Sequence, residues 1–176
     1  MAHLTLVVGG VRSGKSRFAE QLAQAHPPVT YLATARAGDA EMARRIARHR
    51  QRRAADWRTV EESWDLPAAV AGLVAGPGCV LVECLTLWLT NLLVGLPERA
   101  ACTEAEALAE VDALVAGLRQ GSGRLVVVSN EVGWGIIPAN ELARRFGDLL
   151  GEANQRLAAV AAEVYACVAG IPVRIK

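Results

Sequence analysis

Residues 9–16 read Gly9-Gly10-Val11-Arg12-Ser13-Gly14-Lys15-Ser16, directly after the apolar run 4–8. This is the pattern G-x-x-x-x-G-K-[ST] of a phosphate-binding loop, placed between an expected strand and an expected helix. Gly9 and Gly14 permit backbone angles that a side chain would forbid, so the N–H groups of the loop can point at an anion. The positive end of the following helix adds to this attraction. The stretch therefore predicts that residues 9–16 bind a nucleoside triphosphate.

Two side chains of this loop indicate what happens at the phosphates. Lys15 would reach the β and γ phosphates, and the Ser16 hydroxyl would be a ligand of Mg²⁺. Lys15 is one of only two lysines, because arginine supplies the rest of the 19 basic side chains. A guanidinium does not replace the compact charge of an ammonium, so this lysine favours a functional role.

Composition excludes several classes of protein. The 176 residues suit one domain, residues 1–176, with a core of its own. A net charge of +1 creates no field that would attract nucleic acid or an anionic membrane. No apolar stretch reaches the roughly 18 residues of a membrane span, so we expect neither a membrane span nor a targeting signal. The four cysteines form no C-x-x-C pair, which favours free thiols and the cytoplasm.

Apolar runs alternate with helical patterns along the whole chain. This alternation predicts an α/β fold with a mostly parallel sheet flanked by helices. The expected strands are residues 4–8, 29–34, 79–83, 124–129, 163–168 and 171–175. The expected helices are residues 16–25, 39–54, 65–75, 85–95, 103–119 and 140–162. The last strand should lie at an edge of the sheet, because Pro172 cannot donate a ladder hydrogen bond.

Polar side chains follow several of the expected strands. They are Thr34-Ala35-Arg36, Glu83 and Asn130-Glu131. Ligands of an open parallel sheet bind at the carboxyl ends of its strands, so each group is a candidate for binding the nucleotide. Glu83 stands where nucleoside triphosphatases usually carry an aspartate that holds Mg²⁺. We expect it to bind the metal, to position a water or to bond a ribose, and a structural ion pair is the alternative.

Residues 44–53 contain six arginines around His49. On a helix, positions 45, 49, 52 and 53 would share a face, with 42 and 46 on the buried side. Three explanations compete: a solvated basic face, a nucleic-acid patch, and a polyphosphate site. In the third, a neutral imidazole would attack phosphorus while guanidiniums stabilise the developing charge. The patch is disfavoured because the run lacks interleaved aromatic residues.

The stretch 130–138 is a glycine-containing segment of apolar and aromatic residues that follows an expected strand. Loops of this kind, placed beside a binding site, act as lids or line pockets for large hydrophobic substrates. We therefore expect this segment to act as a lid or to line a pocket for a large hydrophobic substrate.

An ordered set of motifs extends over essentially the whole chain. They are residues 9–16, 31–35, 41–49, 57–61, 83–86, 91–93, 129–138, 154–158 and 170–176. The most specific is Ser129-Asn130-Glu131-Val132-Gly133-Trp134-Gly135-Ile136-Ile137-Pro138, which ordinary phosphate-loop kinases lack. With these motifs the chain resembles the bifunctional adenosylcobinamide kinase / adenosylcobinamide-phosphate guanylyltransferase family of cobalamin biosynthesis.

The resemblance implies a RecA-like P-loop NTPase fold and two reactions. In the first, ATP or GTP phosphorylates the aminopropanol hydroxyl of adenosylcobinamide. In the second, GMP passes from GTP to adenosylcobinamide phosphate through a GMP–histidine intermediate, giving adenosylcobinamide-GDP and pyrophosphate. His49 matches the nucleophile, and the family assembles as homotrimers. The residues that would lie against the guanine nucleotide are Arg50, Gln51, Arg52, Arg53 and Glu61.

Two other functions remain open at this point. The first is a plain small-molecule kinase, in which His49 is structural. The second is a nucleotide-dependent RNA-binding protein that uses the arginine-rich helix, and it would bind with a strong dependence on salt.

Overall fold

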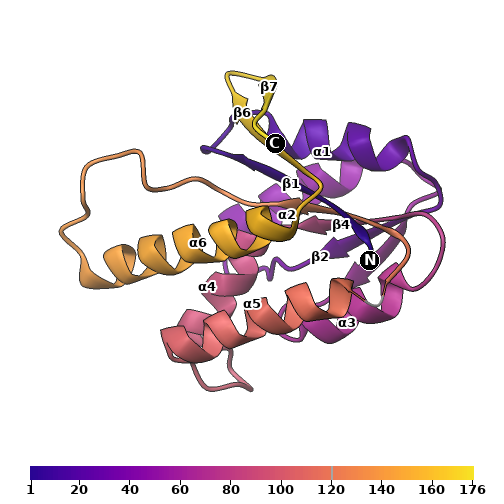
Figure 1. Ribbon diagram of the computed structural model, residues 1–176. Helices are drawn as coiled ribbons and strands as arrows, with labels where there is room; N and C mark the ends of the chain where they lie inside the picture. Colours follow the sequence, from indigo (N-terminus) through magenta and orange to yellow (C-terminus); the bar gives the residue numbers. More distant parts are fainter. Residues whose placement is uncertain (120) are drawn as a thin grey trace.

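A computed structural model describes residues 1–119 and 121–176 and contains one seven-stranded sheet (Figure 1). The strand order is β3-β2-β4-β5-β1-β6-β7, and only β7 runs antiparallel to its neighbour. The strands are β1 (His3–Gly9), β2 (Val29–Ala33), β3 (Arg58–Glu61), β4 (Cys79–Glu83), β5 (Arg124–Val128), β6 (Glu163–Val168) and β7 (Ile171–Arg174). The helices are α1 (Lys15–Gln24), α2 (Ala40–Arg52), α3 (Leu66–Val74), α4 (Leu85–Val94), α5 (Glu104–Leu118) and α6 (Glu141–Val160).

The expected α/β class is confirmed, and each expected strand and helix is present with small differences at its ends. Strand β7 lies at the edge, with Pro172 opposite Cys167, as its missing N–H group predicts. The sequence did not predict β3. This strand has only four residues, none of them buried, so it lacks the apolar run by which the other strands were found.

Two apolar layers cover the two faces of the sheet. One is formed with α3 to α6 and includes Trp88, the largest of the fully buried side chains. The other is formed with α1 and includes Tyr31 of β2. Figure 1 shows α1 on one side of the sheet and α3, α5 and α6 on the other. Because both faces are covered, the strands read as nearly continuous apolar runs.

Helix α2 is attached differently from the other helices. None of its described side chains is buried, and Met42, Ile46 and His49 are half-buried. These three positions lie within one stripe of a helix. The side expected to be buried, at positions 42 and 46, is only half-buried. His49 lies on that side and not on a face with Arg45, which is exposed. Asp39 caps the N-terminus of α2, and its carboxylate accepts a hydrogen bond from the Met42 N–H group at 2.7 Å.

No helix in the described part of the chain is both long enough and apolar enough to cross a membrane.

Candidate functional site

The predicted phosphate loop connects β1 to α1, and its backbone requires glycine at two positions. Gly14 caps α1 in the left-handed region, with φ of 94°, and Gly9 has φ of 158°. A Cβ atom on Gly14 would lie 2.9 Å from the Cα atom of Gly170, and one on Gly9 would lie 2.5 Å from Ser13 Oγ. Glycine is therefore required at both positions because of the backbone angles and because a Cβ atom has no room. The loop rests against the β6–β7 turn, because the Gly170 N–H group donates to the Ser13 carbonyl at 2.9 Å.

The remaining loop residues differ in exposure. Val11 and Arg12 are exposed at the tip, whereas Lys15 is buried. The Lys15 ammonium donates to the Gly10 carbonyl at 3.0 Å, so it lies across the loop. Burial lowers the pKa of Lys15, and the nearby Glu83 carboxylate opposes that shift. An anion bound in the loop would restore the charge stabilisation that burial removes.

Ser16 and Glu83, the two predicted metal ligands, are in direct contact. Ser16 Oγ donates to Glu83 Oε1 at 2.7 Å, although the two residues come from α1 and the end of β4. In the described part of the chain no cluster of three or more carboxylate, imidazole or thiol groups could hold a metal. A hydroxyl and a carboxylate suit Mg²⁺, which commonly takes one or two protein ligands and completes its shell with phosphate and water. The pair therefore fits a metal bound together with a nucleotide.

The stretch after β2 contributes less directly to the nucleotide site. Thr34 is fully buried, and its hydroxyl donates to the Cys84 carbonyl and accepts from the Cys84 N–H group, both at 2.8 Å. It therefore fixes the backbone beside Glu83. Ala35 is half-buried, and Arg36 is exposed in an ion pair with Glu98.

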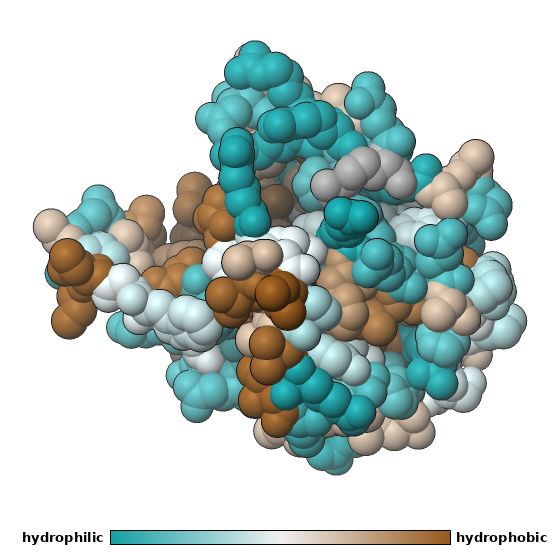
Figure 2. Space-filling view, turned by 90° about the horizontal axis from the view of Figure 1, so that it is seen from above, coloured by the Kyte–Doolittle hydropathy of each residue, from teal (hydrophilic) through white to brown (hydrophobic). Residues whose placement is uncertain are grey.

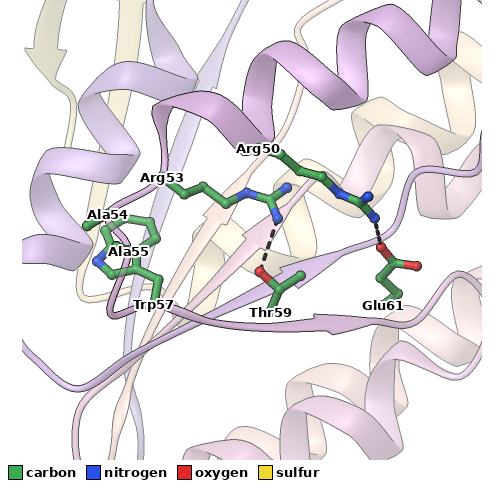
Figure 3. Close-up of a pocket in the computed structure, with 7 residues that line it drawn as sticks. All are labelled: Arg50, Arg53, Ala54, Ala55, Trp57, Thr59 and Glu61. Atoms are coloured by element: carbon green, nitrogen blue, oxygen red, sulfur yellow. Dashed lines mark hydrogen bonds and ion pairs between the residues drawn. The ribbon is translucent and has the colours of Figure 1, made fainter.

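A second group of predicted residues surrounds a pocket of about 430 Å³ (Figure 3). It is lined by Arg50, Arg53, Ala54, Ala55, Trp57, Thr59 and Glu61. Arg50 pairs with the Glu61 carboxylate, and Arg53 donates to Thr59 Oγ1 at 3.1 Å. The two bonds extend from the end of α2 to β3, which frames the pocket between them.

Other predicted residues of this region lie outside the pocket. Gln51 is exposed, and the side chain of Arg52 lies outside the described part of the structure. Within the described residues, His49 is not among those that line the pocket, and it lies one helical turn before Arg53.

Tyr31 of β2 lies next to the pocket. The Arg53 guanidinium lies 3.5 Å from the centroid of its ring, a cation–π contact. Burial, reinforced by the Glu83 carboxylate, raises the pKa of Tyr31, so its hydroxyl stays protonated. Strand β3 is nevertheless four strands from β1, about 19 Å at the usual spacing of neighbouring strands. The pocket and the phosphate loop are therefore separate.

Two asparagines that shape this edge of the sheet lie in the sequence motifs 91–93 and 154–158, which predicted no role for either side chain. Asn91 of α4 donates to the Thr34 and Ser63 carbonyls at 3.0 and 2.9 Å. Asn154 of α6 makes a similar connection to the end of β5. The signal available in each case was an asparagine at a position where helical spacing places apolar side chains.

The segment between β5 and α6 projects from the body of the molecule (Figure 1). Its large apolar side chains, Val132, Trp134, Ile136 and Ile137, are exposed. Figure 2 shows hydrophobic surface at the tip of this projection. An exposed apolar group of this kind marks a surface that contacts a ligand or another protein.

Comparison with known proteins gives matches over nearly the full length. Residues 5–175 match the family described as cobinamide kinase / cobinamide phosphate guanyltransferase. A bifunctional adenosylcobalamin biosynthesis protein, CobP of Pseudomonas aeruginosa PAO1, is 47% identical over 173 residues, 97% of this chain and 96% of that protein. Proteins named CobU, of Salmonella typhimurium LT2 and Escherichia coli K12, are 44% and 43% identical over 180 residues, 98% of this chain and 99% of each.

Solved structures with low sequence identity share the fold. The P4 protein of bacteriophage phi6 in complex with ADP superposes with a TM-score of 0.52 at 15% identity. The ATP synthase subunit NeqB of Nanoarcheaum equitans superposes with a TM-score of 0.53 at 12% identity. The chain spans 54% and 45% of their lengths, and 98% and 94% of its own residues are covered.

Proposed function

The chain belongs to the cobinamide kinase / cobinamide phosphate guanyltransferase family, and we propose how its residues divide the two reactions. It is a bifunctional kinase and guanylyltransferase of cobalamin biosynthesis. The first reaction phosphorylates adenosylcobinamide with ATP or GTP, and the second transfers GMP from GTP to adenosylcobinamide phosphate. The observation that supports this division is the presence of two separate groups of polar side chains, the phosphate loop with Glu83 and the arginine-lined pocket.

The kinase step uses the phosphate loop. Its backbone N–H groups and the Lys15 ammonium would hold the triphosphate. Ser16 and Glu83 would hold Mg²⁺, which would supply neutralisation of charge at the phosphate oxygens. The support for this assignment is the 2.7 Å contact between the two side chains, which a shared cation would replace.

The guanylyl transfer uses His49 as nucleophile. A ring nitrogen attacks the α-phosphorus of GTP, an N–P bond forms, and the bond to pyrophosphate breaks. A phosphate oxygen of adenosylcobinamide phosphate then attacks the same phosphorus and releases the imidazole. Arg50 and Arg53, one turn or less along α2, would stabilise charge on the phosphoryl oxygens.

Helix α2 must approach the α-phosphate for this chemistry. Its described side chains include none that is buried, so the helix can shift without exposing a core. Segments with few buried apolar contacts open at low cost in free energy. We therefore propose that GTP draws α2 toward the phosphate loop.

The finer assignments follow from the same arrangement. We propose that residues 1–176 act as one domain with Mg²⁺ as the metal, and as a homo-oligomer, a trimer by family resemblance. Exposed apolar side chains on the edge strand β7 support self-association, namely Ile171 and Val173. The four free cysteines, three of them buried, support a cytoplasmic location.

Product analysis tests the proposal. The protein is incubated with adenosylcobinamide, Mg²⁺ and GTP, and the corrinoids are identified by mass spectrometry. We expect adenosylcobinamide phosphate first and adenosylcobinamide-GDP second, and neither product with Lys15→Ala. Full turnover by that variant would show that the loop is not the site.

A further inference from the structure

The end of β5 lies between the phosphate-loop strand and the strand that ends in Glu83. Val128 pairs with Val7 of β1 on one side and with Glu83 of β4 on the other. Three residues further on, the Glu131 N–H group donates to the Gly9 carbonyl at 3.1 Å. This bond holds Glu131 against the first glycine of the phosphate loop. The residue therefore lies at the edge of the sheet where the terminal phosphate of a bound nucleotide would lie.

A buried amide fixes this carboxylate. Asn154 of α6 is 7% exposed, and its Nδ2 atom donates to Glu131 Oε1 at 2.9 Å and to the Asn130 carbonyl at 3.0 Å. The Asn130 N–H group donates in turn to Thr86 Oγ1 of α4 at 2.9 Å. Three elements thus immobilise the residues up to Glu131, whereas the next residue, Val132, is already exposed.

Two polar atoms of Asn154 and Glu131 that are not used in the bond between them suggest a role in function. Within the described part of the chain, the buried Asn154 Oδ1 atom has no hydrogen-bond partner. A buried polar atom without a partner costs about 1–3 kcal/mol, so its retention needs an explanation. The bond from Asn154 engages Glu131 Oε1, and Oε2 is left for a further contact.

Glu83 is a poorer candidate for a proton acceptor. Its Oε1 atom already accepts the Ser16 hydroxyl, and its charge acts on the Lys15 ammonium. A carboxylate that accepts a hydrogen bond and lies near a positive charge has a lower affinity for a proton. Glu131 approaches the same edge from the neighbouring strand, at the base of the exposed segment that we expect to act as a lid or to line a pocket for a large hydrophobic substrate.

We propose that Glu131 is the general base of the kinase step and that Asn154 is its positioning residue. This inference rests on the proposed function. The aminopropanol hydroxyl oxygen forms a bond to the γ-phosphorus, and the bond from that phosphorus to the bridging oxygen breaks. The nucleoside diphosphate leaves with the electron pair, and the hydroxyl proton passes to Glu131 Oε2 and then to water.

Glu131→Gln tests the proposal, because a glutamine oxygen can still accept the Asn154 bond but cannot take the proton. The matched control is Asp148→Asn, an exposed carboxylate on the same helix as Asn154. Two assays are run on each variant: γ-phosphoryl transfer to adenosylcobinamide, and GMP transfer from GTP to adenosylcobinamide phosphate.

We expect Glu131→Gln to lower the kinase kcat by about 100-fold or more, the usual contribution of a general base, with GMP transfer unchanged. Formate should restore part of the kinase activity of Glu131→Ala, because it supplies a free carboxylate. Asn154→Ala should lower the kinase kcat about tenfold without changing the nucleotide KM.

Three results would overturn the assignment: a kinase kcat of Glu131→Gln close to that of Asp148→Asn, equal loss of both reactions in Glu131→Gln, or no rescue by formate. Failure of the proposed function is distinguishable, since the unsubstituted protein would then form no adenosylcobinamide phosphate.

Discussion

Replacing Gly14 with alanine should distort the phosphate loop and destabilise the fold. A left-handed backbone costs a residue with a Cβ atom about 1–2 kcal/mol. The new Cβ atom would also meet the Gly170 Cα atom at 2.9 Å, a backbone atom that cannot rotate away. Relieving this contact moves the β6–β7 turn and strains the hydrogen bond from Gly170 to the Ser13 carbonyl, worth about 0.5–1.5 kcal/mol.

Together these effects predict a loss of about 2–3 kcal/mol in the free energy of unfolding, or roughly 5–10 °C in Tm for a chain of this size. Gly10→Ala is the matched control in the same loop. A Cβ atom there meets nothing within 4 Å, and the backbone is not left-handed. Both substitutions reduce the entropy of the unfolded chain alike, so that effect cancels in the comparison.

Urea denaturation measures both variants, and binding of a fluorescent GTP analogue reports on the loop. We expect Gly14→Ala to unfold at lower urea and to bind the analogue weakly, with Gly10→Ala close to the parent in stability. Equal unfolding midpoints for the two variants would refute the explanation by steric contact and left-handed φ.

Three further predictions concern separate parts of the molecule. Glu83→Gln should raise the Mg²⁺ concentration that half-saturates the kinase about tenfold, and an unchanged Mg²⁺ titration would contradict a metal role. Arg53→Ala removes the guanidinium over Tyr31, so the KM for GTP in guanylyl transfer should rise about tenfold. Arg53→Lys should not restore the parent KM, because an ammonium does not stack as a planar group on the ring and does not present the paired N–H donors of a guanidinium. Hydrogen bonds from Thr103 hold the pKa of Glu106 below its usual 4.5. This capping interaction therefore stabilises the fold above that pH, and the stabilisation is lost as the pH falls through the lowered pKa. The difference in urea midpoint between the parent and Glu106→Gln should shrink over the same fall in pH.

Local patterns predicted most of the fold because each pattern reports on its own segment. The run 4–8 followed by the glycine-rich loop predicts a strand, a turn and a helix without reference to the rest of the chain. Strand β3 was missed for the complementary reason. It is stabilised by pairing with β2 and exposes its side chains, so its own residues carry no apolar signal.

The sequence predicted those site residues that directly follow the end of a strand or lie in the phosphate loop. Ser16 and Glu83 were both expected at the metal, and the structure brings their side chains together. Thr34 stays a predicted nucleotide contact, and the structure adds a role that the sequence did not predict, because its hydroxyl bonds to the Cys84 backbone. Which partner a buried polar group finds depends on the order of the strands, which is a property of the whole fold.

The exposure of α2 shows a second limit of sequence patterns. Apolar residues at positions 42 and 46 suggested a buried side, yet two such residues in a strongly charged helix give only partial burial. Asn154 shows a third limit, because its role depends on Glu131, which is 23 residues away in the chain.

The proposed guanylyl transfer depends on a bond between the His49 imidazole and the α-phosphorus of GTP. Labelling with α-³²P and γ-³²P GTP tests it directly. We predict acid-labile labelling of the protein from the α position alone, release of that label onto adenosylcobinamide phosphate, loss of labelling in His49→Ala, and normal labelling in the control His26→Ala. Labelling from the γ position, or undiminished α-labelling of His49→Ala, would contradict the claim.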